Sequence, residues 1–347
     1  MVCIATIASM NYYAQTQVLI ESICQNTNYT KICVLVTDYE LKEHGLSRVN
    51  NCEVLYFSLS DLDISNITEM TFKYNVAELN SSLKPFFINH LLVALDYERV
   101  IFVDPDIYVF ENFTIAYNLL NDFSIVITPH ILYDLSTVNI LDYLQHGLYN
   151  MGFFAVKRDE NTLSFLSWWK NKLIDQCYYD LKNQLCCDQK WMDFAPSLFS
   201  GIHILREPSY NVAFWNLHER DILFKDNQFL VNQRAIVFYH YSNFKFKNPE
   251  YLAYFKEGEF REFTDNHSVR HLFHLYYNKV MAMNYNHYSN IEYGFHRYDN
   301  NAVISNSHRT LYKIKKNEIL FGNPFVTNGE NSFFSYLLKA NLVDKTP

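Results

Sequence analysis

Residues 99 to 110 read Arg99-Val100-Ile101-Phe102-Val103-Asp104-Pro105-Asp106-Ile107-Tyr108-Val109-Phe110. The four apolar residues 100–103, mostly β-branched, predict a strand that is buried on both faces. Two carboxylates one residue apart follow it, and an unpaired carboxylate is costly to bury. Hard divalent cations accept such oxygen ligands and carry substrate phosphates on their open positions. The Asp-x-Asp pattern therefore suggests metal-assisted chemistry on a phosphate-bearing substrate, with a solvated turn as the alternative.

Strands and helices alternate along the first half of the chain. The predicted strands are 1–8, 31–37, 53–57, 100–103, 124–128 and 152–157. The predicted helices are 15–25, 79–95 and 165–174. Pro85 is expected near the first turn of the second helix. The alternation predicts an α/β fold with a doubly wound, mainly parallel central sheet flanked by helices, which binds ligands where strands end. Asp38, Asp104 and Asp106 all lie at such ends.

The composition is that of an acidic globular protein. Lys and Arg total 29 and Asp and Glu total 37, which gives a formal net charge of −8. This balance argues against a nucleic-acid partner, because such a partner is held mainly by neutralising its phosphates. Seven cysteines without a repeating spacing indicate a reducing compartment. Neither a secretory signal nor a membrane span is predicted, so we expect a cytoplasmic protein.

The pattern weakens after about residue 250. We therefore divide the chain into a catalytic domain, 1–250, and a helical or irregular C-terminal extension, 251–347, with helical stretches at 255–263 and 269–283. The extension is a candidate for acceptor, membrane-surface or oligomer contacts. Its lysines at 313, 315 and 316 are either a solvated face or a peripheral contact with the cytoplasmic face of the inner membrane. The sequence leaves the oligomeric state open.

Seven polar segments occur in an order that resembles bacterial glycosyltransferases of the GT-A fold, most closely the metal-dependent, retaining group called family 8-like. They span roughly residues 1 to 247. The segments are Ala5-Thr6, Glu78 with Leu83-Lys84-Pro85, Val103-Asp104-Pro105-Asp106, Tyr149-Asn150-Met151-Gly152-Phe153, 187–193, 210–220 and 238–244. Each segment alone is modest evidence for this resemblance, and all seven in the same order are strong evidence. The resemblance implies a Rossmann-like, nucleotide-sugar-binding domain.

The resemblance also implies a metal site. Asp106 and Asp104 would hold Mn²⁺ or Mg²⁺, and Asp104 would also touch the ribose of the donor. His240 would be the third protein ligand, although a lone His on an apolar run is otherwise a core residue. The divalent ion would neutralise a departing nucleoside diphosphate as a Lewis acid. By resemblance alone, the donor is expected to be a UDP-sugar.

Further residues are expected around the donor. The residues assigned to the nucleotide sugar are Ala5, Thr6, Asp38, Lys84, Asp104, Asn150, Gly152 and Lys245. Asn150 and Gly152 would lie in a loop that holds sugar hydroxyls, or in an ordinary turn before a strand. Lys245 or Lys247 would face the diphosphate. Similar sequences tend to carry Gly where this chain has Asn243, and Asn is the best substitute where a positive φ is needed.

Two catalytic residues follow from the resemblance. Gln189 would stabilise oxocarbenium-like charge through its amide oxygen, and Asp188 would bind sugar hydroxyls. No carboxylate is a clear covalent nucleophile, so we expect retention with attack on the face that the leaving group departs from. Trp215 is either a stacking residue of the acceptor pocket or a buried anchor.

Three functions are compared. The first is a hexosyltransferase-type enzyme that moves a sugar to a glycan or glycolipid acceptor of a cell-surface polysaccharide such as lipopolysaccharide or capsule. The second is a metal-dependent phosphohydrolase that uses Asp104 and Asp106. A two-metal site needs further carboxylates close together, and the other carboxylates are scattered along this sequence. The third is a catalytically silent GT-A-like sugar-binding protein, against which the intact motifs argue.

Overall fold

An eight-stranded sheet forms the centre of the molecule. The structure is a computed structural model, and it describes residues 1–39, 46–134, 139–256, 258–263, 265–329 and 331–342. In spatial order the strands are β11 (Ile202–Ile204), β7 (Ile125–Pro129), β8 (Tyr149–Lys157), β5 (Arg99–Val103), β1 (Val2–Ala8), β2 (Lys31–Val36), β4 (Cys52–Phe57) and β3 (Leu46–Val49). Strands β8 and β3 run against the other strands, which share one direction. The sheet is therefore mainly parallel, and the predicted α/β class is confirmed.

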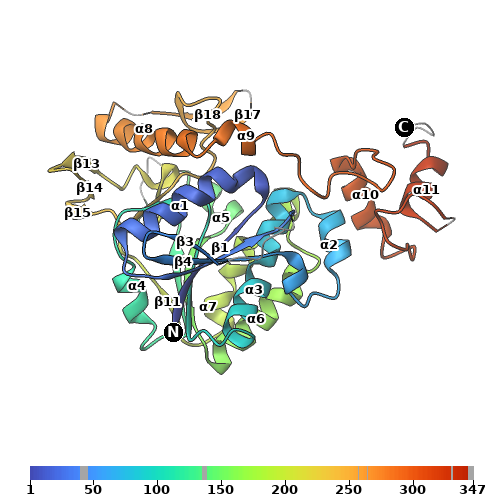
Figure 1. The fold of residues 1–347 in the computed structure, drawn as a ribbon, viewed down its shortest axis with the longest axis horizontal. Coiled ribbons are helices and arrows are strands. Elements are labelled where there is room, and N and C mark those ends of the chain that lie inside the picture. The colour runs from blue at the N-terminus through green and yellow to red at the C-terminus, as the bar shows by residue number, and fades with distance from the viewer. Residues whose placement is uncertain (40–45, 135–138, 257, 264, 330, 343–347) are drawn as a thin grey trace.

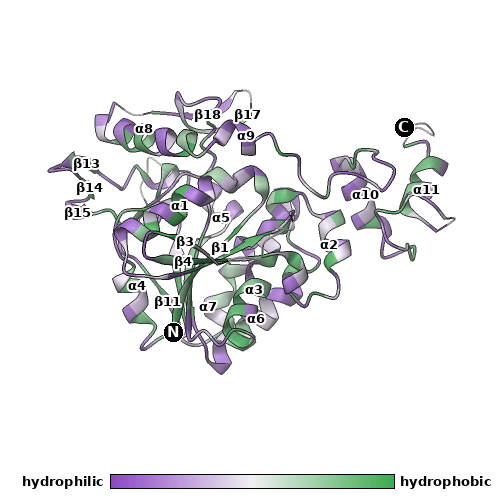
Figure 2. Ribbon diagram, viewed as in Figure 1, coloured by the Kyte–Doolittle hydropathy of each residue, from purple (hydrophilic) through white to green (hydrophobic). Residues whose placement is uncertain are grey.

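Helices cover both faces of this sheet (Figure 1). The helices of the first 200 residues are α1 (Tyr13–Asn26), α2 (Ile67–Lys73), α3 (Val76–Val93), α4 (Thr114–Leu119), α5 (Ile140–His146), α6 (Glu160–Leu173) and α7 (Ala195–Leu198). Alternate residues of β1 face opposite cores, as the pleat of a strand requires. Cys3 and Ala5 pack with α3 and α6, whereas Ile4 packs with α1 and α4. Figure 2 shows the central strands as hydrophobic.

Helix α3 begins earlier than the prediction. Asn75 caps it by accepting hydrogen bonds from the backbone N–H groups of Ala77 and Glu78, and the Glu78 carboxylate accepts from the Asn75 N–H. This capping box was readable in the sequence as Asn75-x-x-Glu78 and was missed. Pro85 consequently lies inside the helix and not in its first turn. The expectation for Pro85 was wrong because the helix start had been placed too late.

Smaller sheets surround the central one. They are β12 (Val212–Ala213) with β16 (Phe238–His240) and β6 (Ile107–Val109), β13 (Ile222–Lys225) with β14 (Gln228–Val231) and β15 (Arg234–Ala235), β9 (Tyr179–Asp180) with β10 (Leu185–Cys186), and β17 (Tyr251–Lys256) with β18 (Glu259–Glu262). The last hairpin replaces the helix that we expected over 255–263. The two strands pair antiparallel, and the helical interpretation of that stretch was wrong.

The C-terminal residues pack in two places. Helices α8 (His267–Ala282) and α9 (Tyr285–Tyr288) lie over α1, and α8 shares a core with β16. An extended segment then leads to α10 (Asn306–Lys315) and α11 (Phe333–Lys339), which sit to one side of the sheet (Figure 1). These two helices enclose Phe72 of α2 in a small aromatic core. None of the described helices is long and apolar enough to cross a membrane. The boundary at residue 250 between a catalytic domain and a C-terminal extension stays a prediction.

The basic cluster of the C-terminal region makes contacts within the molecule. Lys316 forms ion pairs with Glu69 and Asp175, and Lys315 pairs with Glu318. The Lys313 ammonium lies over the Tyr178 ring. The peripheral membrane contact of these lysines stays a prediction.

Candidate metal centre and donor site

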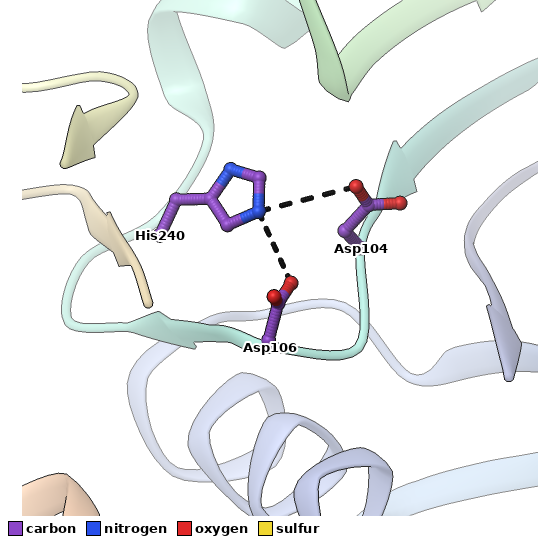
Figure 3. Close-up of side chains that lie close together, drawn as sticks. All are labelled: Asp104, Asp106 and His240. Atoms are coloured by element: carbon purple, nitrogen blue, oxygen red, sulfur yellow. Dashed lines mark ion pairs between the residues drawn. The ribbon is translucent and has the colours of Figure 1, made fainter. Parts of the chain in front are cut away.

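Asp104, Asp106 and His240 come together at the edge of the central sheet where β1, β2 and β5 end, here called the carboxyl edge (Figure 3). The Nε2 atom of His240 lies 3.1 Å from Oδ1 of Asp106 and 4.0 Å from Oδ2 of Asp104. One ligand atom from each residue lies within 4.8 Å of the other two. In the described part of the chain, no other group of three acidic, histidine or cysteine side chains is arranged in this way.

Two strand pairings build this cluster. Asp104 and Asp106 belong to the turn between β5 and β6, and the Asp104 N–H donates to the carbonyl of Gly152. Strand β6 pairs antiparallel with β16, which sets His240 opposite Ile107. The N–H of Tyr241 donates to the Asp106 carbonyl and locks this register. The imidazole is therefore brought beside the Asp-x-Asp turn by backbone pairing between segments that are distant in the sequence.

Burial and the neighbouring charges shift the pKa values of all three residues of the cluster. Burial raises the pKa of Asp104, and the neighbouring Lys84 offsets this only in part. Burial also opposes the charge of Asp106, but His240 outweighs it and the pKa of Asp106 falls below its usual range. Burial lowers the pKa of His240, whereas Asp106 and Asp104 raise it, and the carboxylates prevail. Lys84 and His240 thus offset part of the charge of the two carboxylates.

The residues present fit a divalent cation. Two carboxylates and an imidazole Nε2 are ligands that Mn²⁺ accepts. Gly152 leaves the room for it, since a Cβ there would lie 2.5 Å from Cε1 of His240 and 2.9 Å from Oδ2 of Asp104. The Nδ1 atom of His240 is buried and has no hydrogen-bond partner among the described residues. The three ligand side chains and the space left by Gly152 therefore agree with the predicted metal site.

Lys84 connects the cluster to one of the predicted catalytic residues. It lies on α3 and is 5% exposed. Its ammonium nitrogen is 3.0 Å from Oδ2 of Asp188 and 3.3 Å from Oδ1 of Asp104, and it donates to the carbonyl of Met151. Burial lowers the pKa of Lys84, but the carboxylates of Asp104 and Asp188 outweigh burial and raise it above its usual range. Lys84 is thus a charged bridge between the two carboxylates.

Asn150 and Gly152 lie within β8, so the expected loop is a strand. Because β8 runs against β5, its first residues reach the carboxyl edge at which β5 ends. Oδ1 of Asn150 accepts from the N–H of Gly152, and Nδ2 lies 3.3 Å from Nε2 of His130. The sequence interpretation missed the reversed direction of β8, which puts these two residues beside Asp104.

Gln189 occupies the first position of a 3₁₀ helix, Gln189–Asp193. Its side-chain nitrogen donates to the carbonyl of His146 at 2.9 Å. Its amide oxygen accepts no hydrogen bond from the described residues. Asp188 precedes it and is 4% exposed. The catalytic roles of Gln189 and Asp188 stay predictions.

The other residues predicted to bind the nucleotide sugar differ in their surroundings. Ala5 and Thr6 lie within β1 and are fully buried. Asp38 directly follows Thr37 at the end of β2, is half-buried, and accepts from the N–H of Met10 at 2.9 Å. Burial lowers the pKa of Lys245, and the negative charge of Asp106 offsets part of this shift. Lys245 is thus close enough to the cluster to feel its charge, whereas Lys247 is exposed.

Asn243 has φ +58°, the left-handed conformation for which glycine is otherwise preferred. Asn at position 243, where a glycine was expected from the resemblance, therefore preserves the turn after His240. Asn tolerates this conformation better than most residues do.

Two side chains near the cluster, His130 and Tyr12, carried no clear signal in the sequence. Nδ1 of His130 is 2.8 Å from the carbonyl of Gly147, and burial lowers the pKa of His130 to about 4. Its ring lies 5.4 Å from that of Trp215, which in turn lies 5.3 Å from the His240 ring. Burial raises the pKa of Tyr12, and the carboxylate of Asp106 raises it further. Only the sheet topology brings these rings together.

Comparisons with known proteins give distant similarities. No protein-family model matches the chain. The uncharacterized protein YfnF of Bacillus subtilis (strain 168) is 24% identical over 249 residues, which are 69% of this chain and 80% of that protein. YfnD of the same strain is 22% identical over 247 residues, covering 69% of this chain and 77% of YfnD.

Three solved structures are similar in shape. A galactosyltransferase, LgtC, in complex with donor and acceptor sugar analogs is 13% identical, covers 81% of this chain and 95% of its own, and gives a TM-score of 0.45. The glycosyltransferase GlyE of Streptococcus pneumoniae TIGR4 is 14% identical over 85% of this chain and 66% of its own, with a TM-score of 0.47. Mouse xyloside xylosyltransferase 1 is 14% identical over 69% of this chain and 97% of its own, with a TM-score of 0.43.

Proposed function

We propose that this protein is a metal-dependent glycosyltransferase. It moves a sugar from a nucleoside-diphosphate donor, with UDP as the expected nucleotide, to a glycan acceptor of a cell-surface polysaccharide. The observation that carries the proposal is the Asp104–Asp106–His240 cluster at the carboxyl edge. A mainly parallel sheet binds ligands at this edge. The cluster is joined through Lys84 to Asp188, which is polar, buried and next to Gln189.

The residues divide the work of the reaction. The bound cation, Mn²⁺ or Mg²⁺, supplies Lewis-acid neutralisation of the diphosphate. Asp104 and Asp106 hold it with His240, and Lys245 adds positive charge near the same phosphates. Lys84 holds the Asp188 carboxylate in place through their ion pair. Asp188 then accepts hydrogen bonds from sugar hydroxyls, and the oxygen of Gln189 stabilises positive charge at the anomeric carbon. No covalent nucleophile is assigned, and we propose retention of configuration.

A phosphohydrolase is the less favoured function. Two-metal hydrolases hold their ions with several closely spaced carboxylates. Among the described residues only Asp104, Asp106 and His240 form such a group, and Lys84 already neutralises the nearby Asp188. One candidate cation site with a buried Lys84–Asp188 ion pair beside it fits transfer better than hydrolysis of a simple ester.

The test is a donor screen. The wild-type chain is incubated with Mn²⁺ and a panel of nucleotide sugars, and release of the nucleoside diphosphate and transfer of the sugar are both followed. We expect turnover of one donor, its loss with EDTA, and its loss in Asp106→Ala but not in the exposed control Asp122→Ala. Turnover of p-nitrophenyl phosphate instead would favour the hydrolase. Undiminished donor turnover in Asp106→Ala would show that the metal assignment is wrong.

A further inference from the structure

A buried histidine, His130, lies against the segment that leads into β8. It directly follows β7 and is 6% exposed. Nδ1 of its ring is 2.8 Å from the carbonyl oxygen of Gly147, and Nε2 is 3.3 Å from Nδ2 of Asn150. The backbone of His130 is held as well, because its N–H donates to the carbonyl of Leu148 and its carbonyl accepts from the side chain of Asn216. The ring therefore has a defined position relative to Asn150.

The partners of the ring determine where its proton lies. A backbone carbonyl only accepts hydrogen bonds, so Nδ1 of His130 carries a proton and donates to Gly147. Burial lowers the pKa of His130 to about 4, so the ring holds a single proton near neutral pH and Nε2 is an acceptor. Nε2 then accepts from the amide nitrogen of Asn150. The ring thus requires the NH₂ group of Asn150, and not its oxygen, on the side that faces it.

The oxygen of the same amide lies on the side of the metal cluster. Oδ1 of Asn150 accepts from the N–H of Gly152 at 3.1 Å. A Cβ at Gly152 would lie 2.9 Å from this oxygen, 2.9 Å from Oδ2 of Asp104 and 2.5 Å from Cε1 of His240. The three atoms therefore surround one small space beside Gly152. The amide orientation decides whether an acceptor or a donor faces that space.

Two hydrogen bonds select one orientation of the amide. Among the described residues, the side chain of Asn150 is hydrogen-bonded to Nε2 of His130 and to the N–H of Gly152. If the amide were turned over, its NH₂ group would face the N–H of Gly152 and its oxygen would face the lone pair of Nε2. Two donors would then meet on one side and two acceptors on the other, so both bonds would be lost. Without the ring, only the bond to Gly152 would resist this rotation.

We propose that His130 is a positioning residue that holds the Asn150 amide with its oxygen towards the metal cluster. The inference rests on the proposed function and on the prediction that Asn150 contacts the donor sugar. Oδ1 of Asn150 has a second acceptor position besides the one that serves Gly152. This position accepts from a hydroxyl of the sugar. The sugar recognised at this point therefore carries a free hydroxyl, because a substituted or missing hydroxyl offers the oxygen no proton.

The first test compares the sugar with the nucleotide that carries it. Calorimetry with Mn²⁺ measures binding of UDP-glucose, UDP-galactose, UDP-N-acetylglucosamine, GDP-mannose and dTDP-glucose, and of UDP, GDP and dTDP. His130→Phe and His130→Leu both remove the hydrogen bonds of the ring, so a folding defect in one leaves the other. For the nucleotide sugar that the wild type binds most tightly, we expect about tenfold weaker binding, as for loss of one hydrogen bond. Binding of its nucleoside diphosphate should not change.

Two further variants separate hydrogen bonding from packing. His130→Gln should recover most of the lost affinity, because its amide offers a donor to Gly147 and an acceptor to Asn150. His274→Leu, at an exposed position of α8, is the control and should bind as the wild type does. When Asn150 is already alanine, His130→Leu should weaken sugar binding by less than about twofold more. A full additional loss in that background would show that His130 does not act through Asn150, which overturns the inference.

The position of the proton is tested without a ligand. In metal-free protein labelled with ¹⁵N-histidine, the ring signals missing from His130→Gln belong to His130. They should show Nδ1 protonated and Nε2 unprotonated near neutral pH. A proton on Nε2 overturns the inference even where the enzyme is active.

The binding outcomes separate this inference from the proposed function. Unchanged binding of the nucleotide sugar in a folded His130→Phe or His130→Leu variant overturns the inference, and so does equal weakening of the nucleoside diphosphate. If the wild type binds a nucleoside diphosphate with Mn²⁺ but no nucleotide sugar, the sugar site at Asn150 is refuted while the metal site stands. If it binds none of these compounds, the proposed function is refuted and the inference falls with it.

Discussion

The ammonium nitrogen of Lys84 lies 3.0 Å from Oδ2 of Asp188, and both side chains are almost completely buried. The same nitrogen is 3.3 Å from Oδ1 of Asp104. One cation of α3 therefore holds a carboxylate of the metal cluster and the carboxylate beside Gln189 at a fixed separation. This relationship couples the predicted metal ligands to the predicted sugar-binding residues.

Replacing Lys84 tests this coupling. Lys84→Met leaves Asp188 buried without its cation and removes the ammonium beside the half-buried Asp104, and losing one partner of a buried pair costs about 3–5 kcal/mol of unfolding free energy. Urea unfolding measures the change. The exposed pair Lys315–Glu318 supplies the control, and Lys315→Met should leave the unfolding midpoint unchanged. Adding Asp188→Asn to Lys84→Met should recover part of the loss, and no recovery would argue that Lys84 acts by packing alone.

Gly152→Ala should damage the metal site more than the fold. The new Cβ would lie 2.5 Å from Cε1 of His240 and 2.9 Å from Oδ2 of Asp104, so these two side chains must shift. We expect Mn²⁺ affinity to fall by tenfold or more, with overpacking that costs about 1–3 kcal/mol of stability. Electron paramagnetic resonance of free Mn²⁺ measures the affinity. Gly322→Ala, where the Cβ meets open space, is the control. Wild-type Mn²⁺ affinity in a folded Gly152→Ala variant would contradict this geometry.

The stability of the protein should fall as the pH is lowered through the titration of His130. Its folded pKa is depressed to about 4 by burial, against an ordinary value of 6.5. Between these values the unfolded chain binds a proton that the folded chain does not, so stability falls as pH decreases and levels off below pH 4. The full effect is about 3 kcal/mol, at 1.36 kcal/mol for each pH unit.

The measurement for His130 compares unfolding midpoints from pH 7.5 to pH 4. His130→Gln should flatten the dependence over this window, whereas His274→Gln, on the exposed side of α8, should retain the wild-type slope. An unaltered slope in His130→Gln would assign the acid sensitivity to other groups.

Gln189→Ala should lower turnover and leave donor binding almost intact. The side chain is held by its bond to the His146 carbonyl, so its oxygen is positioned before substrate arrives. Removing one preorganised polar group near developing charge typically lowers kcat by about 10²–10³-fold. Steady-state kinetics give kcat, and calorimetry with the nucleoside diphosphate gives affinity. A parallel loss of nucleotide affinity would indicate that Gln189 shapes the pocket and does not act in the reaction.

The sequence by itself determined the main strands of the central sheet and the end at which their polar residues lie. Short, mostly β-branched runs such as 100–103 favour buried strands, and Asp38, Asp104 and Asp106 follow such runs directly. The start of α3 was also determined locally, by Asn75 and Glu78. These features depend on residues within a few positions of one another, so a single sequence is sufficient to predict them.

Only the tertiary structure decided which polar residues meet. His240 reaches Asp106 because β16 pairs with β6, and Gly152 reaches Asp104 because β8 runs against β5. Gly294 reaches Asp38 because Arg309 ties a distant segment to the start of α3. Local periodicity tells which face of a strand is buried, but it does not specify the neighbour or the direction of the strand. Those choices depend on the packing of the whole chain, and they set the chemistry of the site.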